Sequence, residues 1–372
     1  MVEKFSLKDH LFNAETVGQL AREFGAAVLD FDSERFEREA LSGFDERELM
    51  ARMEWMADCI QGQLNPDFEQ MALQLEAAMP PPLDPTLKDD DFGHFIHAIP
   101  GILAVRHGME THRERAMELL YRATQRFSME FYIRPFLVRW PSQTLDTLRT
   151  WAGDENYHVR RLVSEGTRPK LPWAKAVNLD ANQTLPLLGL LYGDPTRFVT
   201  RSVANHLNDL SKKDPDKVLA TLAGWKAEGG QDKKELDWIT RHALRTLIKS
   251  GHPGAMEALG YQLNAPLQVK LDIKTPDVAI GDSLIFDCDI ASEQDMPILV
   301  DYRIEFSRPN GRSAEKVFKL KQSQVGPKRA FKVTKTHKLK ANASTFTWHP
   351  GTHRLILQIN GADRQEATFT VV

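Results

Sequence analysis

The segments SQTL (residues 142–145) and NQTL (residues 182–185) differ at one position and lie forty residues apart. Both are followed, at equal distances, by a leucine, a Gly-Asp pair and the pattern valine-x-arginine-x-valine. A looser third copy lies around Ile239 and Arg241. A period near forty residues is typical of HEAT-type repeats, in which each unit is a pair of helices. We therefore predict an α-solenoid, whose stacked units expose one continuous concave face.

The repeat places an arginine at the same point of three successive units, at Arg161, Arg201 and Arg241. Equivalent residues of stacked repeats line up along one face of a solenoid. A row of cations attracts a partner that carries many negative charges. We therefore expect a polyanion to lie along the concave face.

The chain has 372 residues, which is enough for two domains with substantial cores. No apolar run approaches the roughly 18–20 residues that span a bilayer, so no membrane association is expected. The N-terminus lacks a basic leader followed by an apolar segment, so no secretory signal is expected either. The two cysteines, Cys59 and Cys288, lie far apart in what we predict to be different domains. This favours a cytoplasmic protein without a disulfide or a cysteine metal site, and we expect a monomer.

The net charge of −3 conceals a strong asymmetry along the chain. Residues 1–111 carry 22 acidic and 9 basic residues, whereas residues 112–264 carry 17 acidic and 23 basic residues. Residues 265–372 carry 12 acidic and 16 basic residues, and eleven of these cations lie between Arg308 and Lys340. Localised basic segments in an acidic protein favour a defined polyanion-binding surface. For the C-terminal cluster, a solvated, lysine-rich sheet face is the alternative.

Up to about residue 264, apolar residues recur at three- and four-residue spacing, which predicts helices. The run Pro80-Pro81-Pro82 interrupts this pattern as a stiff connector. The Gly-Asp pairs at 153–154 and 193–194 suit the end of one helix and the turn before the next. The helices with the clearest boundaries are expected at residues 16–29, 33–41, 46–61, 68–79, 112–127 and 128–138.

After Pro266 the apolar residues alternate with a period of two, which predicts β-strands. Turn residues such as Gly281-Asp282, Pro309–Gly311 and Asn360-Gly361 separate the strands. Strands are expected at residues 268–273, 284–290, 298–306, 316–320, 330–337, 353–359 and 366–371. Short strands at this density suggest an antiparallel immunoglobulin-like β-sandwich. We thus predict a multidomain α plus β protein, with a HEAT-like helical domain at 1–264 and the sandwich at 265–372.

The densest group of chemically active side chains is the segment DENYHVRRLVSEGTRPKLPW, residues 154–173. Its centre is a glutamate, Glu165, that precedes a glycine. The cations around it are Arg160, Arg161, Arg168 and Lys170, which we predict to bind DNA. Two plainer interpretations remain open: Glu165 as the i, i+4 partner of Arg161, and Trp173 as a core residue of the repeat.

The second repeat contributes a group of polar side chains in SVANHLNDLSKK, residues 202–213. Asn205 lies one repeat after Glu165. Side chains of this kind contact backbone phosphates with little reading of the base sequence. The candidate phosphate contacts are Asn205, His206, Ser211, Lys212 and Lys213, together with Arg201 and Arg241.

Common signatures of cofactor and metal sites do not occur: no phosphate loop, dinucleotide fingerprint, HExxH motif or zinc-type cysteine pair is present. His94 and His97 stand at i, i+3, a spacing that can bind a metal, but no acidic third ligand is evident. We interpret this pair as capping or packing residues. We predict neither a metal nor a cofactor.

The strings SEGTRPKLPW (164–173) and GDPTRFVTRSVANHLNDLSKK (193–213) resemble the AlkC family of bacterial alkylbase DNA glycosylases, which is HEAT-like and related to AlkD. The resemblance covers nearly the whole chain, because some members also carry an immunoglobulin-like domain. It implies removal of cationic methylated bases (3-methyladenine, 3-methylcytosine and 1-methyladenine) from double-stranded DNA without base flipping. It also implies that Glu165 is the catalytic carboxylate, that Trp173 contacts the deoxyribose at the lesion, and that Glu130 is a second active-site carboxylate.

The residue types agree with that chemistry. A positively charged base is already an activated leaving group, so the oxocarbenium-like sugar is the difficult part of the reaction. A fixed carboxylate stabilises this charge and positions water, and an aromatic face adds cation–π attraction. Because no lysine nucleophile is needed, we predict a monofunctional glycosylase, with the basic sandwich as a DNA clamp. A non-catalytic DNA-binding scaffold and a protein-binding solenoid remain as other hypotheses.

Overall fold

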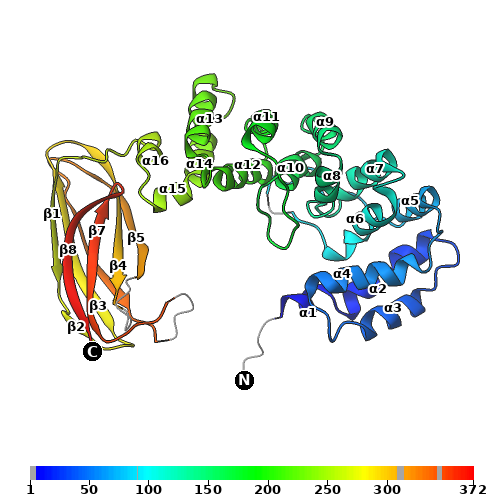
Figure 1. The fold of residues 1–372 in the computed structure, drawn as a ribbon, viewed down its shortest axis with the longest axis horizontal. Coiled ribbons are helices and arrows are strands. Elements are labelled where there is room, and N and C mark those ends of the chain that lie inside the picture. The colour runs from blue at the N-terminus through cyan, green and yellow to red at the C-terminus, as the bar shows by residue number, and fades with distance from the viewer. Residues whose placement is uncertain (1–5, 90, 308–313, 342–345) are drawn as a thin grey trace. The chain divides into compact units, whose positions relative to one another are not determined.

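The computed structural model describes residues 6–89, 91–307, 314–341 and 346–372 (Figure 1). The predicted turn at 309–311 and the cations Arg308 and Arg312 lie outside the described residues. The chain divides into two compact units. We call them the helical unit (Met1–Asp214 with Gly224–Ala243) and the sandwich unit (Pro215–Ala223 with Leu244–Val372).

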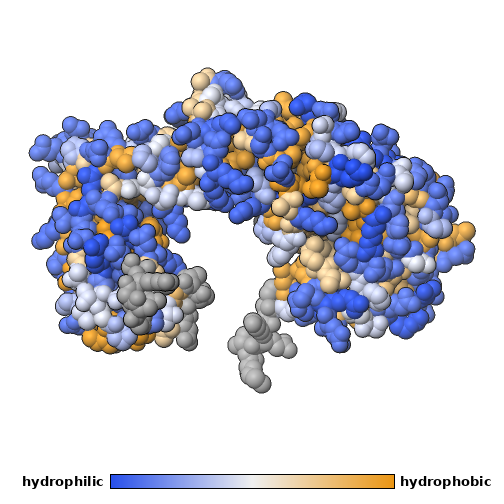
Figure 2. All heavy atoms as spheres, viewed as in Figure 1, coloured by the Kyte–Doolittle hydropathy of each residue, from blue (hydrophilic) through white to orange (hydrophobic). Residues whose placement is uncertain are grey.

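Helices make up the helical unit and the first part of the sandwich unit. In chain order they are α1 (Leu7–Leu11), α2 (Ala14–Ala27), α3 (Ser33–Ser42), α4 (Leu49–Gln61), α5 (Phe68–Ala77), η1 (Phe95–Ala98), α6 (Ile99–Leu103), η2 (Ala104–Gly108), α7 (Arg113–Thr124), α8 (Ile133–Arg139), α9 (Pro141–Trp151), α10 (Tyr157–Gly166), α11 (Ala181–Leu191), α12 (Arg197–Ser211), α13 (Pro215–Glu228), α14 (Lys233–Ala243), α15 (Arg245–Lys249) and α16 (Pro253–Ala258). Figure 2 shows that hydrophilic residues cover most of the visible surface of these helices, because their apolar faces turn inward. Across the described residues, every helix is too short or too polar to cross a membrane.

The forty-residue echo corresponds to three successive helix pairs, α9–α10, α11–α12 and α13–α14. The second helices pack side by side, α10 on α12 and α12 on α14, as Figure 1 shows. The aspartate of each Gly-Asp pair lies in the turn between paired helices. Asp154 and Asp194 each accept a backbone N–H two residues later, at 2.8 Å in both turns. The predicted α-solenoid is therefore confirmed.

One predicted helix begins later than expected. The stretch 128–138 was expected to be helical throughout, but α8 begins only at Ile133 and residues 128–132 form an irregular loop. Pro135 explains the correction, because proline lacks an N–H and its ring fits only the first turn of a helix. The loop brings the side chains of Ser128 and Glu130 into the interior.

All seven predicted strands form, and several are longer than expected, β5 and β8 by the most. The strands are β1 (Leu267–Ile273), β2 (Asp277–Val278), β3 (Ser283–Ser292), β4 (Met296–Phe306), β5 (Ala314–Val325), β6 (Phe331–Lys338), β7 (Gly351–Ile359) and β8 (Ala362–Val371), of which only the short β2 was not predicted. They form a three-stranded sheet in the order β1-β3-β6 and a five-stranded sheet in the order β2-β8-β7-β4-β5. Alternate side chains of both sheets meet in one core, which confirms the immunoglobulin-like sandwich.

Helices α15 and α16 pack against the sandwich. Met256 and Tyr261 form a buried cluster with Leu299 of β4. The buried Asn360 links the same parts, since its amide accepts from the Leu299 N–H and donates to the Gln262 carbonyl, both at 2.9 Å. The domain boundary at residue 264 stays a prediction, and the compact unit around the sandwich begins earlier in the chain.

Candidate active site

The sequence of α10 explains why Glu165 is buried at its end. Val159, Leu162 and Val163 turn into the core at helical spacing, and each is 0% exposed. Gly166 follows Glu165 because α8 packs closely there: a Cβ atom at this position would lie 2.5 Å from the Ile133 side chain. The close packing of α8 on the last turn of α10 leaves Glu165 only 5% exposed.

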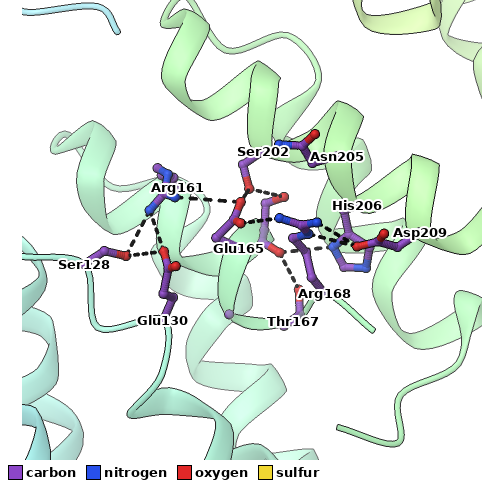
Figure 3. A network of polar contacts seen from close by, with 12 residues as sticks. Ser128, Glu130, Arg161, Glu165, Thr167, Arg168, Ser202, Asn205, His206 and Asp209 are labelled. Atoms are coloured by element: carbon purple, nitrogen blue, oxygen red, sulfur yellow. Dashed lines mark hydrogen bonds and ion pairs between the residues drawn. The ribbon is translucent and has the colours of Figure 1, made fainter. Parts of the chain in front are cut away.

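Three groups surround the Glu165 carboxylate (Figure 3). Arg168 Nη1 lies 2.5 Å from Oε1, and the Ser202 hydroxyl lies 2.6 Å from Oε2. Arg161 Nη2, the i, i+4 partner considered from the sequence, is 3.9 Å from Oε2. The pairing with Arg161 is therefore the longest of the three contacts, and it does not by itself account for the burial of Glu165.

Glu130 is the second buried carboxylate of this network, and Arg161 joins it to Glu165. Glu130 Oε2 accepts from Arg161 Nη1 at 2.9 Å and from the Ser128 hydroxyl at 2.7 Å. The Arg161 guanidinium also lies 4.3 Å from the ring centroid of Phe198, which covers it. Two carboxylates from different elements thus share one buried arginine.

The surroundings of Glu165 keep its carboxyl group ionised. Burial by itself raises the pKa of Glu165, but the charges of Arg161 and Arg168 and the hydrogen bonds from Ser202 and Arg168 outweigh burial and lower the pKa below its usual range. A negative charge is therefore maintained in a position that water scarcely reaches.

One face of α12 fixes the last turn of α10. Ser202, His206 and Asp209 stand at i, i+4 and i+7, which places them on the same side of the helix. The ring of His206 bonds the Ser164 carbonyl through Nδ1 at 3.1 Å, and Asp209 Oδ2 accepts two bonds from Arg168 at 2.9 and 3.0 Å. The neighbouring repeat therefore holds both the backbone beside Glu165 and the arginine that pairs with it.

The loop that follows α10 is anchored by Arg134, a fully buried residue of α8. Its guanidinium donates to the carbonyls of Gly166, Arg168 and Lys175 at 3.0, 2.8 and 2.6 Å. Burial lowers the pKa of Arg134 to about 10. A cavity of about 440 Å³ lies beside this loop, and its polar lining is Arg134, Arg168, Lys170, Asp209 and Lys212.

Trp173 stands on this loop and is 65% exposed, so it is not the core tryptophan considered from the sequence. Its φ of 62° lies in the left-handed region, which a bulky residue rarely adopts. An exposed indole in a strained conformation is a feature of ligand-contacting sites.

The structure separates the predicted phosphate contacts into accessible and inaccessible residues. Lys170, Lys212, Lys213 and Arg241 are exposed. Asn205 and Arg201 are half-buried; Asn205 Oδ1 lies 2.9 Å from His242 Nε2, and Arg201 forms an ion pair with Asp89 at 2.5 Å. His206 and Ser211 are 0% and 1% exposed, so their side chains are poorly placed to meet a phosphate.

Three arginines that were predicted to bind DNA pair with carboxylates of the protein instead. Arg168 is one of them, since it binds Glu165 and Asp209. Arg160 binds Asp194 at 2.5 and 3.2 Å and thereby ties one repeat to the turn of the next. Arg161, the first member of the predicted arginine column, is 8% exposed and faces Glu130. Burial and pairing argue against a phosphate contact by these side chains. Of the three aligned arginines, Arg201 and Arg241 therefore remain accessible.

The pair His94 and His97 packs as interpreted from the sequence. The two rings stack at 6.0 Å, and His97 Nε2 lies 3.0 Å from Glu23 Oε2. Within the described ranges, His, Cys, Asp and Glu side chains form no group of three or more that could hold a metal.

Two family models match successive parts of the chain. Residues 127–247 match a family described as DNA alkylation repair enzyme, and residues 268–372 match the C-terminal Ig-like domain of the uncharacterised protein YhaZ. The first stretch contains Glu130, Glu165 and the three helix pairs. The family match and the fold place the chain in the class of helical-repeat DNA alkylation repair proteins.

Two proteins are similar over nearly the whole chain. YhaZ of Bacillus subtilis (strain 168), described as uncharacterized, is 30% identical over 370 residues, which are 97% of this chain and 98% of YhaZ. The Pseudomonas fluorescens alkylpurine DNA glycosylase AlkC, solved bound to DNA containing an abasic site analog, matches with a TM-score of 0.85 and 29% identity, over 99% of this chain and 100% of that one. The chain belongs to the AlkC family, in the form that carries a C-terminal Ig-like domain.

Proposed function

We propose that this protein is a monofunctional DNA glycosylase that hydrolyses the N-glycosidic bond of alkylated bases bearing a positive charge. The observation that carries the proposal is the pair of buried carboxylates, Glu130 and Glu165, joined by Arg161. The similarity of the whole chain to an alkylpurine DNA glycosylase supports the same class of reaction. We expect 3-methyladenine, 3-methylcytosine and 1-methyladenine in double-stranded DNA as substrates, excised without base flipping.

The chemistry favours a carboxylate without a strong general acid. When the bond breaks, the bonding electrons leave with the base, so a cationic base departs as a neutral molecule. The anomeric carbon then carries positive charge. An ionised carboxylate in a nearly dry position stabilises that charge more strongly than one in water, because the local dielectric constant is low. Glu165 meets this requirement, since its partners keep it ionised while it is 5% exposed.

Water completes the reaction at the anomeric carbon. One of the two carboxylates orients the water molecule and accepts its proton as the new C–O bond forms, which leaves an abasic site. We assign stabilisation of the sugar cation to Glu165. We assign the orientation of water and acceptance of its proton to Glu130. The exposed indole of Trp173 offers a face to the sugar, where cation–π attraction strengthens as positive charge develops.

We propose that the exposed cations hold the DNA backbone. Lys170 and Lys212 line the cavity beside the Arg134-anchored loop, and Lys213 and Arg241 are exposed elsewhere on the helical unit. Arg201 reaches a phosphate by exchanging its ion pair with Asp89. The lysines of the sandwich strands are the proposed clamp on the duplex. Contacts of this kind confer affinity without reading sequence.

The decisive experiment replaces Glu165 with glutamine, which keeps the size of the side chain and removes the charge. We expect Glu165→Gln to release 3-methyladenine from methylated duplex DNA at least about a hundredfold more slowly than the wild type. Its affinity for a duplex with an abasic-site analogue should change only a few-fold. Glu155→Gln, an exposed glutamate two residues before α10, is the matched control and should retain full activity.

Two outcomes would contradict this proposal. Near wild-type excision by Glu165→Gln would remove Glu165 from the reaction. DNA binding by the wild type without release of any methylated base would favour the non-catalytic scaffold.

A further inference from the structure

We infer that Ser202 is a positioning residue for the reaction, whose hydroxyl group fixes the orientation of the Glu165 carboxylate. The inference rests on the proposed glycosylase function and deepens it. Ser202 lies on α12, in the repeat after the one that carries Glu165. The active site is therefore completed by two neighbouring repeats.

The direction of the hydrogen bonds follows from counting protons. The Ser202 hydroxyl lies 2.6 Å from Glu165 Oε2 and 2.9 Å from the Ser164 hydroxyl (Figure 3). A hydroxyl group has one proton to donate, and an ionised carboxylate can only accept. Ser202 therefore donates to Glu165 and accepts from Ser164. The result is a chain of two hydrogen bonds that both point toward Glu165, an arrangement in which each bond polarises the next.

The surroundings of this chain leave it little freedom. Ser164 is 0% and Ser202 2% exposed, so water does not compete with either hydroxyl group. His206, one turn after Ser202, binds the Ser164 carbonyl at 3.1 Å. Burial lowers the pKa of His206 to about 4, so at neutral pH its ring is neutral and Nδ1 must carry the proton for this bond. The same face of α12 thus holds the backbone of Ser164 and, through Ser202, the side chain of Glu165.

The two oxygens of Glu165 depend on different groups. Oε1 is held by Arg168 at 2.5 Å, and Arg168 is itself anchored on Asp209. Oε2 has Ser202 at 2.6 Å, and the next donor, Arg161, lies at 3.9 Å. Without the Ser202 hydroxyl, Oε2 would keep only the distant Arg161, although Arg168 would still hold Oε1. The plane of the carboxylate, which is soft for glutamate, would then be restrained at one oxygen in place of two. A carboxylate that is less well oriented stabilises the developing sugar cation less effectively.

A second consequence concerns ionisation. Burial raises the pKa of Glu165. Arg161, Arg168 and the hydrogen bond from Ser202 lower this pKa, and together they outweigh burial. Removing Ser202 deletes one lowering contribution and leaves the other groups in place, so the pKa should rise. The charged and titratable groups that face Glu165 from all packed elements are Arg134, Glu130, Arg161, Arg168, His206 and Asp209.

The test compares Ser202→Ala with two variants of the full-length protein. Ser202→Thr keeps the hydroxyl group. Thr200→Val removes another buried side-chain hydroxyl of α12, which donates to Glu235 Oε1 at 2.6 Å and does not touch Glu165. Single-turnover release of 3-methyladenine is measured from about pH 4 to 8, together with the Kd for abasic-site duplex DNA.

We expect Ser202→Ala to be about tenfold slower at neutral pH, as for loss of one hydrogen bond to a charged group. The acid limb of its pH–rate profile should move to higher pH, and its Kd should stay within about threefold of the wild type. Ser202→Thr should recover most of the rate, and Thr200→Val should match the wild type. An unchanged acid limb in Ser202→Ala, whatever its rate, would overturn the inference.

A readout without catalysis separates this inference from the proposed function. If the wild type releases no base, the glycosylase proposal fails. Carbon-13 NMR titration of the Glu165 carboxyl in wild type and Ser202→Ala then decides the role of Ser202. A higher pKa in the variant supports the positioning role, and equal values overturn it.

Discussion

At the scale of single residues, Glu165 is held by a balance of opposing effects. Removing a carboxylate from water costs several kcal/mol, and the nearby guanidinium and hydroxyl groups offset that cost only while all of them are present. Arg168 and Ser202 each contribute a short contact, and Asp209 keeps Arg168 in place. Loss of any one partner therefore leaves the buried charge less well compensated.

His158 leads to a prediction about stability in acid. It is 5% exposed, and burial, followed by the charge of Arg161, lowers its pKa to about 4. An unfolded histidine takes up a proton near pH 6.5. Between about pH 6.5 and 4 the unfolded state therefore binds a proton that the folded state does not, and stability is lost as the pH falls. Replacing His158 with phenylalanine should remove up to about 3 kcal/mol of this acid destabilisation.

Thermal unfolding of the helical unit at several pH values measures this effect. The exposed His10, changed to phenylalanine, provides the control and should leave the acid-induced loss unaltered. The same loss of stability in the wild type and in His158→Phe would show that His158 does not titrate in this way.

Only some of the site residues could be predicted from the sequence. Glu165 and Trp173 lie in the distinctive string SEGTRPKLPW, and Glu130 lies in a less distinctive one, SMEFYIRPF (residues 128–136). Ser202 and Asp209 were missed as partners of the carboxylate network because no local pattern links them to residues about forty positions earlier. Arg160 and Ser211 were expected to contact phosphate, yet they are occupied by Asp194 and by the Asn208 carbonyl. Residue type alone does not distinguish a cation that binds a ligand from one that binds its neighbour.

At the scale of secondary-structure elements, the loop after α10 is defined by its anchor as much as by its own sequence. Arg134 is 0% exposed and donates to three backbone carbonyls between residues 166 and 175. Pro169 and Pro172 restrict the backbone further. This anchoring gives Trp173 a defined place although its side chain is exposed.

Arg134→Met tests the anchoring of this loop. Methionine fills much of the same space but cannot donate to the carbonyls, so we expect the loop to open more often. Trypsin should then cleave after Lys170 and Lys175 about tenfold faster than in the wild type. Arg139→Met, at the half-exposed end of the same helix, is the control. Equal cleavage of the three proteins would mean that the prolines, and not Arg134, order the loop.

The elements themselves were largely predictable, because helical and extended backbones impose periods of 3.6 and 2 on the apolar residues. The start of α8 was predicted wrongly, since apolar residues continue through 129–133 at a spacing that also suits a helix. Pro135 was the signal that could have corrected it, as proline marks the first turn. That correction matters, because the resulting loop carries Glu130.

At the scale of the whole molecule, the boundary between compact units does not coincide with the change from helices to strands. Helix α16 packs on the sandwich through Met256, which forms a buried cluster with Tyr261 and Leu299, and Ile248 of α15 packs against the same cluster. The Arg364 guanidinium also bonds the Leu263 carbonyl at 2.5 Å. These contacts make the helical stretch after Ala243 part of the sandwich unit.

Truncation tests this organisation. A protein comprising residues 244–372 should be more stable than one comprising 265–372 by about 2–3 kcal/mol, because the shorter one exposes Leu299 and leaves Asn360 and Arg364 without their carbonyl partners. Chemical unfolding of the two proteins gives the difference. Tyr261→Ala in the longer protein should reproduce part of the loss. Equal midpoints and slopes would show that α15 and α16 do not stabilise the sandwich.

The amino-acid sequence by itself determined the repeat period, the alternation of the strands and the string that contains Glu165. These features are local, because the geometry of a helix or a strand dictates which positions of its own segment are apolar. Only the tertiary structure decided which residues join Glu165 in one buried network. They are Ser202 and Asp209 from the next repeat and Glu130 from an irregular loop. Contacts between residues so far apart in the sequence depend on how separate helices pack. The energy of a buried ion pair depends in turn on all the groups that exclude water from it.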